Sequence, residues 1–179
     1  MTMDHFLEEV VVKQRNTLNR IVYYLSWPVM IVSGFMAMMM LQGLMRAFSI
    51  PALVITLLFA AMAVLIFLFH DRLLTEYEYT FTNGALDFAE VYNNKKRKSL
   101  GSLNVKTVDA FGKVNSGSFQ RYLKTLDVKQ MRWFLNREAE LYYFYFSKDS
   151  VKKMIILEPS EEMVGMIKQY IPRGVYQEN

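Results

Sequence analysis

Four consecutive cations have the side chains needed to bind phosphate or another anion: Lys95, Lys96, Arg97 and Lys98. We call these residues the basic run. Near an anionic cytoplasmic leaflet each such residue contributes about 1 kcal/mol of attraction, so the run is a candidate for contact with lipid headgroups. Two alternatives stay open. The run is either a solvated turn that only promotes solubility and fixes topology, or part of a site for a specific phosphoinositide-type or protein ligand.

Few residues are suited to catalysis or metal binding. The chain has no Cys, which excludes thiolate chemistry and Cys-ligated metals, and only His5 and His70 supply imidazole. Glu76 and Glu78 alternate with Tyr, which is typical of an exposed strand face. A net charge of +4 over 179 residues is too small for a nucleic-acid binder. We therefore predict no catalytic residue, no metal, no cofactor and no nucleic-acid partner.

Ala52, Thr56 and Ala60 recur every four residues within an apolar segment. Small side chains at that spacing let two membrane helices approach closely. They predict a helix-packing face. Its partner is either another helix of the same chain, a second copy in a homo-oligomer, or a larger membrane protein.

Two long segments carry no charge, residues 21–45 and 47–69, with Arg46 between them. A hydrocarbon core about 30 Å thick is crossed by roughly 20 apolar helical residues. Each segment is long enough. We therefore predict a transmembrane helical hairpin over residues 21–70 and a multi-pass protein of the cell membrane.

The distribution of Lys and Arg predicts the orientation of this hairpin. Three cations precede the first span, and Arg72 and the basic run follow the second, whereas Arg46 alone lies in the connection. Because cations accumulate in cytoplasmic flanks, we expect both termini in the cytoplasm and a short external turn near residues 42–51. Residues 1–20 are predicted to be a cytoplasmic helix, either a continuation of the first span or an amphipathic helix on the bilayer.

Residues 71–179 are predicted to form one small cytosolic domain. Residues 75–82 alternate between aromatic and polar side chains, Asn83 and Gly84 are a strong hairpin signal, and residues 85–92 are the return strand. Asn93 and Asn94 predict a second turn. Further strands are predicted over residues 98–103, 104–111, 132–136, 141–146 and 151–157. Residues 119–126 fit either a short helical turn or an irregular strand.

The chain is predicted to end in an amphipathic helix. Pro159 suits a first helical position, and Pro172 follows the last apolar position of the segment. The helical stripe consists of Met163, Met166, Ile167, Tyr170 and Ile171. The fold class is therefore α+β, with a two-helix hairpin followed by about seven antiparallel strands and a final helix.

This order resembles a pleckstrin-homology-like (PH-like) domain, a β-sandwich or barrel capped by a C-terminal helix. The resemblance lies in the Asn83–Gly84 hairpin, the basic hairpin over residues 92–98 and the strand–strand–helix ending over residues 141–171. The whole chain, including its tail over residues 171–176, is similar to a family of small uncharacterised bacterial membrane proteins with two transmembrane helices and such a domain.

The resemblance implies a membrane-anchored, non-catalytic binding or scaffold protein of the cytoplasmic leaflet. Its expected partners are the lipid bilayer, anionic headgroups, its own oligomer or another membrane protein. The alternative function is an accessory or regulatory subunit of a larger membrane transporter or secretion complex.

Overall fold

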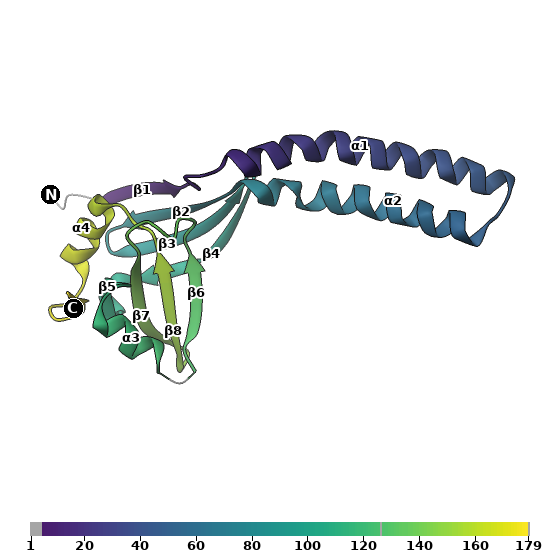
Figure 1. The fold of residues 1–179 in the computed structure, drawn as a ribbon. Helices are drawn as coiled ribbons and strands as arrows, with labels where there is room; N and C mark the ends of the chain where they lie inside the picture. Colours follow the sequence, from purple (N-terminus) through teal and green to yellow (C-terminus); the bar gives the residue numbers. More distant parts are fainter. Residues whose placement is uncertain (1–4, 126, 179) are drawn as a thin grey trace. The chain divides into compact units, whose positions relative to one another are not determined.

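A computed structural model describes residues 5–125 and 127–178 (Figure 1). The chain divides into two compact units. One is Arg15–Thr75, and the other joins the residues up to Gln14 with those from Glu76 onward. The predicted domain of residues 71–179 is therefore incomplete, because the β unit also includes a strand from the N-terminal segment. The helical hairpin is an insertion between the first two strands of the domain.

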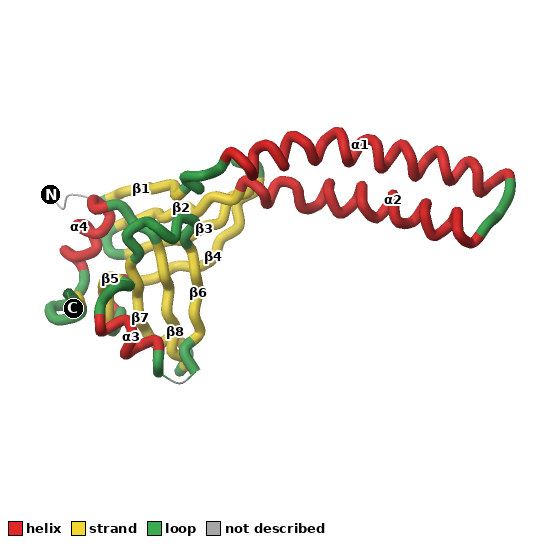
Figure 2. The backbone as a smooth tube through the Cα atoms, in the orientation of Figure 1, coloured by secondary structure: helices red, strands yellow, loops and turns green. Residues whose placement is uncertain are grey.

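The inserted unit consists of two long helices, α1 (Thr17–Arg46) and α2 (Ile50–Phe69), followed by the short 3-10 helix η1 (His70–Leu74) (Figure 2). Both helices are long and apolar enough to cross a membrane. Only 6% of the most apolar 18-residue stretch of each helix is buried within the protein. The connection between them, residues 47–49, is shorter than the expected turn because α1 continues through Arg46.

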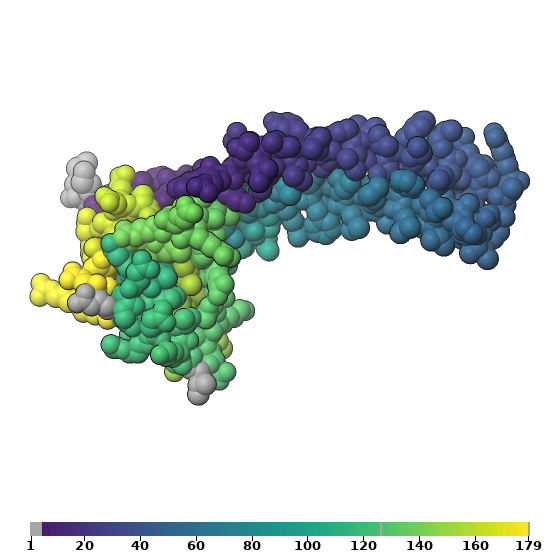
Figure 3. Space-filling model, viewed as in Figure 1, coloured from purple at the N-terminus to yellow at the C-terminus, as the bar shows by residue number. Residues whose placement is uncertain are grey.

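The two helices pack along one another through a narrow seam (Figure 3). The less exposed positions of α1 recur at intervals of three and four residues, as in a coiled coil. They include Tyr23, Ser26, Met30, Ser33, Ala37 and Met40. Ser33 and Thr56 are buried, and their hydroxyls donate to carbonyl oxygens of their own helices, Val29 at 2.7 Å and Ala52 at 2.8 Å. The seam thus accommodates two polar side chains without an unpaired hydroxyl.

The prediction of an N-terminal helix over residues 1–20 is wrong for most of the described part of that segment. Phe6–Val11 is a strand, β1, and only the part from Thr17 is helical; residues 1–4 lie outside the described residues. β1 pairs antiparallel with β2 (Thr75–Thr82) from Phe6 opposite Thr82 to Val11 opposite Tyr77. The apolar residues of Phe6–Val11 fit a helical spacing as well as an alternating one. The segment forms a strand because the backbone of β2 provides hydrogen-bond partners for its N–H and C=O groups.

β1 is one edge of a four-stranded sheet with the order β1-β2-β3-β4, where β3 is Ala85–Tyr92 and β4 is Lys96–Asn104. The predicted bounds of β2 and β3 are confirmed. Asn83 and Gly84 have φ values of 49° and 95°, as a two-residue hairpin turn requires. The predicted turn at Asn93 and Asn94 also has left-handed φ values of 51° and 53°.

A second sheet has the order β6-β8-β7-β5-β9 among the described residues. Its strands are β5 (Ala110–Lys113), β6 (Lys129–Trp133), β7 (Tyr142–Lys148), β8 (Val151–Leu157) and β9 (Tyr176–Gln177). The expectation of purely antiparallel strands is wrong, because β6 pairs parallel with β8 and β5 pairs parallel with β9. Both parallel pairs join segments that are distant in sequence.

Two further predictions need correction. The strand expected over residues 104–111 is broken by a 3-10 turn, η2 (Val105–Thr107), because the Asn104 side chain accepts a hydrogen bond from the Lys106 amide at 3.0 Å. The strand expected over residues 132–136 lies earlier, as β6. For residues 119–126 a helix and a strand were both open; residues 119–123 belong to the helix α3 (Gly117–Leu123), and residue 126 lies outside the described residues.

The main core lies between the two sheets. Tyr79 and Phe81 of β2 and Leu86 and Phe88 of β3 share one buried cluster with Phe144 and other residues of the second sheet. The C-terminal helix α4 (Glu161–Tyr170) adds Met163, Val164 and Ile167 to that cluster.

The opposite face of β7 is also covered. Tyr143 and Tyr145 pack with Phe119 of α3 in a second cluster, so the predicted central strand is buried on both faces. The apolar character of every residue from Tyr142 to Phe146 follows from this double coverage.

Candidate functional site

The basic run lies at the hairpin between β3 and β4. Lys95 is in the turn, and the other three residues begin β4. All four side chains are exposed. Because successive strand residues point to opposite faces, Lys96 and Lys98 share one face of β4 and Arg97 lies on the other.

Two carboxylates oppose part of this charge. The Arg97 guanidinium forms an ion pair with Glu78 at 2.8 Å, and Glu90 is the register partner of Lys98. A pair with one exposed partner contributes little to stability, about 0–1 kcal/mol. Its larger effect is on position, since it fixes Arg97 against β2.

The basic run is at a defined end of the first sheet. β2 runs from Thr75 to its turn at Asn83, and β3 returns to Tyr92, so the β3–β4 turn lies beside the start of β2. Val11, at the end of β1, lies opposite Tyr77 near the same end. The end of β1, which leads to the hairpin, and the start of β2, which follows the hairpin, therefore lie at one end of the first sheet. The basic run lies at that same end.

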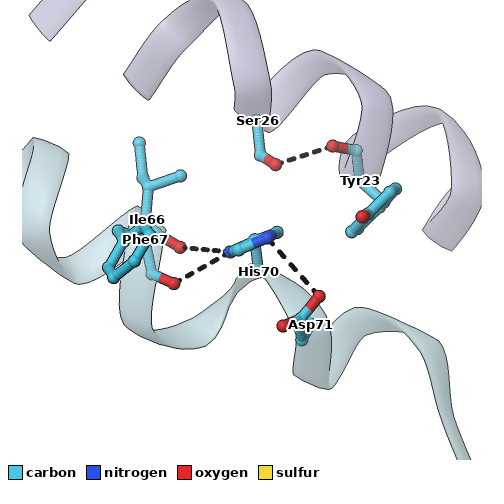
Figure 4. A network of polar contacts seen from close by, with 6 residues as sticks. All are labelled: Tyr23, Ser26, Ile66, Phe67, His70 and Asp71. Atoms are coloured by element: carbon cyan, nitrogen blue, oxygen red, sulfur yellow. Dashed lines mark hydrogen bonds and ion pairs between the residues drawn. The ribbon is translucent and has the colours of Figure 1, made fainter. Parts of the chain in front are cut away.

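Within the hairpin unit, a polar network surrounds His70 (Figure 4). The His70 Nδ1–H donates to the carbonyl oxygens of Phe67 at 2.9 Å and Ile66 at 3.1 Å, and Nε2 lies 3.4 Å from an Asp71 carboxylate oxygen. The imidazole is buried and stacks on the Tyr23 ring, with centroids 5.5 Å apart. The network closes the seam where α1 begins and α2 ends.

An open apolar groove runs beside this network. Both helices contribute to its walls, which are lined by Val22, Leu25, Ser26, Val29, Leu65, Ile66, Phe69, His70 and Leu73. A second apolar groove on α2 shares Leu65 and Ile66 with the first and continues to Ile55. At the His70 end, the Arg72 guanidinium lies 4.7 Å from the centroid of the Phe69 ring.

A third groove, in the β domain, is lined by four glutamates together with apolar residues of the N-terminal segment. Asn136 also lines it; its side-chain amide donates to the Val12 carbonyl at 2.9 Å and to the Glu158 carboxylate at 2.8 Å, and accepts from the Gln14 backbone amide at 2.8 Å. Asn136 thus pairs with the backbone of the segment that leads to α1. The arrangement anchors that segment to the domain.

Glu9 extends this network on the core-facing side of β1. Its carboxylate oxygens accept from the Ser160 amide at 2.9 and 3.0 Å, next to the start of α4. Burial raises the pKa of Glu9, and the Ser160 hydrogen bonds oppose that shift only in part. Burial likewise raises the pKa of Tyr79, whose hydroxyl donates to the Trp133 carbonyl and accepts from the Glu158 amide at 3.3 Å. These groups hold the two sheets together.

The small-residue face predicted from Ala52, Thr56 and Ala60 lies along the seam of the hairpin. Thr56 is buried, and Ala52 and Ala60 are half-buried. Since α1 packs along α2, the buried Thr56 lies in the contact between the two helices, whereas Ala52 and Ala60 remain partly exposed. Within the described residues, no group of three His, Asp or Glu side chains is placed to hold a metal ion.

Sequence reasoning did not find Asn136, Glu9 or Glu158. An isolated Asn and two scattered Glu carry no local signal, because their partners are 22 or more residues away in the chain. The basic run was visible as a charge cluster, but its ion pair with Glu78 required the sheet.

The fold is a small β domain with an exposed basic run, into which a hairpin of two helices long and apolar enough to cross a membrane is inserted. The chain belongs to the family "Bacterial PH-like domain (DUF6106)", whose model matches residues 3–177. The predicted resemblance to a bacterial PH-like family is therefore confirmed over nearly the full chain. Comparison with curated proteins and with solved structures found no match.

Proposed function

We propose that this chain is a membrane-anchored, non-catalytic binding or scaffold protein whose PH-like domain is held against the anionic cytoplasmic leaflet. One observation carries the proposal. The apolar hairpin is inserted between β1 and β2, so the domain has two covalent connections to the hairpin at the end of the sheet that bears the basic run.

Membrane insertion of the hairpin is favoured by its exposure. The core helix of a soluble protein would be mostly buried, whereas Leu57, Leu58 and Leu68 and most other apolar side chains of α1 and α2 are more than 40% exposed. Exposing apolar surface to water costs roughly 25 cal/mol of free energy for each Å². Contact with lipid hydrocarbon in place of water removes that cost.

Contact with headgroups is favoured by charge and by connectivity. Thr75, the first residue of β2, directly follows η1 in the chain, and the β3–β4 turn lies beside the start of β2 in the sheet. Each cation near an anionic leaflet contributes about 1 kcal/mol. Three or four together would restrict the orientation of the domain.

The test uses full-length protein in lipid nanodiscs. Because the chain has no Cys, a spin label can be attached to a single Ser99→Cys or Ser150→Cys substitution. Ser99 is exposed on β4 directly after the basic run, and Ser150 is exposed in the β7–β8 turn. Lipids with a Ni²⁺-chelating headgroup then report how closely each label approaches the bilayer surface.

We expect relaxation of the Ser99 label by Ni²⁺ lipids to increase when anionic lipid replaces neutral lipid, and to exceed that at Ser150. Replacing all four residues of the basic run with Ser should abolish the effect of anionic lipid. A control variant loses the same number of exposed cations elsewhere, with Ser at Lys124, Lys129, Lys148 and Lys152, and should retain the effect of anionic lipid. Equal relaxation of the Ser99 label in anionic and neutral nanodiscs would refute headgroup binding.

A further inference from the structure

The second sheet has a regular edge strand, β6. It follows β8 without a register shift, from Lys129 opposite Lys153 to Trp133 opposite Leu157. It stands at one end of the strand order β6-β8-β7-β5-β9 (Figure 1). An edge strand directs alternate backbone N–H and C=O groups away from its neighbour. Because β6 contains no proline, these groups can pair with an added strand.

The other edges of the two sheets are less suitable for strand addition. β4 has a bulge in its pairing with β3, between Phe88 and Ala89, and Gly101 of β4 has a φ of 140°. Asn136 binds the backbone directly after β1, and β9 consists of two residues. A bulge twists a strand and interrupts the regular spacing of its hydrogen bonds. Among the described strands, β6 therefore offers the most regular free backbone.

Lysines gather at the end of the second sheet where β6 begins. β7 ends at Lys148, Lys152 is the second residue of β8, and the parallel register of β6 adds Lys129 beside them. These three side chains are exposed and make no ion pair within the described part of the chain. Lys153 pairs with Asp149 at 4.0 Å. The sheet thus assembles a basic cluster from residues that are scattered in the sequence.

Two of these lysines lie side by side. Lys129 and Lys153 are register partners on neighbouring strands, about 4.8 Å apart at the backbone. Like charges directly opposite one another are destabilising. Asp127 and Asp149 are the acidic residues nearest to them in the chain, and both are exposed, so water screens their attraction for the lysines. An anionic side chain opposite Lys129 on an added strand would neutralise the lysine pair.

The two faces of β6 specify the side chains of such a strand. Met131 and Trp133 are half-buried and pack against the main core. Lys129 is on the same face, at the end of that row, and the exposed Arg132 is on the opposite face. A complementary strand would present apolar side chains opposite Met131 and Trp133. It would present acidic side chains opposite Lys129 and Arg132.

We propose that β6 is the docking edge for an acidic, extended segment of a partner protein, which joins the second sheet as an added strand. In strand addition, backbone hydrogen bonds supply affinity and the alternating side chains supply specificity. The inference goes beyond the proposed function, because it gives the β domain a protein ligand. It does not depend on headgroup contact, since the basic run begins β4 and β4 belongs to the other sheet.

The probe is the peptide Glu-Glu-Val-Glu-Val-Glu-Glu, with blocked ends and a fluorescent label. Its sequence reads the same in both directions, so parallel and antiparallel addition both place Val opposite Met131 and Trp133 and Glu opposite Lys129 and Arg132. Fluorescence anisotropy follows its binding to the full-length protein in nanodiscs of neutral phosphatidylcholine, with empty nanodiscs as the blank. We expect saturable binding, and absence of binding would overturn the proposal.

Two comparisons separate strand addition from charge attraction. The peptide Glu-Glu-Glu-Val-Val-Glu-Glu has the same charge and should bind about five-fold more weakly, because one Val leaves the apolar face. Two further peptides are N-methylated, one at both Val and the other at the second and sixth residues. An added strand directs alternate N–H groups toward its neighbour, so one of these two peptides, and not both, should lose binding. Retention or loss by both would overturn strand addition.

Charge variants locate the peptide on the protein. Lys129→Gln combined with Lys153→Gln should weaken binding by about five-fold, since each removes an exposed cation from the site. Lys96→Gln combined with Lys98→Gln removes two cations from β4 and should leave binding unchanged. Loss of binding in the β4 variant but not in the β6 variant would assign the peptide to the basic run and overturn the proposal.

A second copy of the chain is the other possible occupant of this edge. An antiparallel two-fold pair of β6 strands would place Met131 opposite the same residue of the other copy, so Met131→Cys would form a disulfide-linked dimer on oxidation. We expect no such dimer, and its formation would overturn the proposal. None of these results bears on membrane attachment, which the spin-label experiment tests separately.

Discussion

Val11 at the end of β1 lies directly opposite Tyr77 of β2, although the entire helical hairpin separates these residues in the chain. In an antiparallel pair, the chain leaves one strand and enters the next at the same end of the sheet. Both outer ends of the hairpin are thereby tied to one end of the β domain. Both ends of the hairpin must therefore lie on the same side of a membrane that it crosses. Two spans satisfy this requirement, because an even number of crossings returns the chain to the side from which it started.

The first prediction concerns orientation. The connection between α1 and α2 contains Ser49, and the β domain contains Ser150, both exposed. Since the flanking cations favour cytoplasmic termini, a Ser49→Cys variant should react with a membrane-impermeant maleimide in intact cells. Ser150→Cys should react only after the cells are permeabilised. The reverse labelling pattern would place the domain outside the cell.

Asn136 should control the segment that leads into α1. Its side chain makes two hydrogen bonds with the backbone of Val12 and Gln14, so Asn136→Ala leaves these groups without partners. We expect a loss of about 1–3 kcal/mol in stability of the β domain and faster trypsin cleavage at Lys13 and Arg15. Asn115→Ala, at an exposed loop residue, is the matched control. Unchanged cleavage at both sites would show that the anchor is dispensable.

Glu9 should make the stability of the domain depend on pH. Burial raises the folded-state pKa of Glu9 above its ordinary value of 4.5, so the folded state retains the proton longer than the unfolded state. Stability should therefore fall as pH rises through the interval above 4.5, and the loss is complete above the folded-state pKa. Glu9→Gln keeps an acceptor for the Ser160 amide and removes the charge.

The free energy of unfolding of Glu9→Gln relative to the parent should thus increase with pH across that interval, as measured by denaturant titration in detergent. Glu8→Gln, on the exposed face of the same strand, serves as the control and should follow the parent. A constant difference between Glu9→Gln and the parent at every pH would contradict the burial argument.

Gly112 should be required for the β5–β9 pair. A Cβ at this position would lie 2.7 Å from the Gln177 carbonyl oxygen, a backbone atom that cannot rotate away. Gly112→Ala should therefore displace β9, lower stability by about 1–3 kcal/mol and speed trypsin cleavage after Arg173 in the segment before β9. Gly165→Ala in α4 meets no atom within 4 Å and should raise stability by about 1 kcal/mol. Thermal unfolding of both variants in detergent tests the contrast.

Thr56 should limit the approach of the two helices. Its side chain is buried in the seam, so Thr56→Leu overpacks it and should cost about 1–3 kcal/mol in mixed-micelle unfolding. Val54→Leu adds a comparable volume at an exposed position of the same helix and should have little effect. If Thr56→Leu left the stability unchanged while Val54→Leu disrupted an oligomer or complex, the helix-packing face of α2 would lie at Val54 and not at Thr56.

Several elements were predictable because their signals are local. The β2–β3 hairpin depends on alternation and on Asn83 and Gly84 in the turn, all within 18 residues of chain. Helix α4 was likewise predicted from its own apolar stripe, but its start was predicted wrongly: Pro159 is not the first helical residue, because the helix begins at Glu161 and Ser160 is the N-cap, whose hydroxyl accepts from the Met163 amide. The basic run was found in the same way, as consecutive charges.

Long-range pairing decided the rest. The amino-acid order alone was enough for two lipid-length helices, for the adjacent hairpins and for the α+β class, because each depends on neighbours in the chain. It could not assign β1 to a sheet, pair β6 parallel to β8, join Arg97 to Glu78 or place Asn136 beside Val12. Each of these contacts exists only after distant segments have packed around the common core, and hydrogen bonds formed there override the local preference of the residues involved.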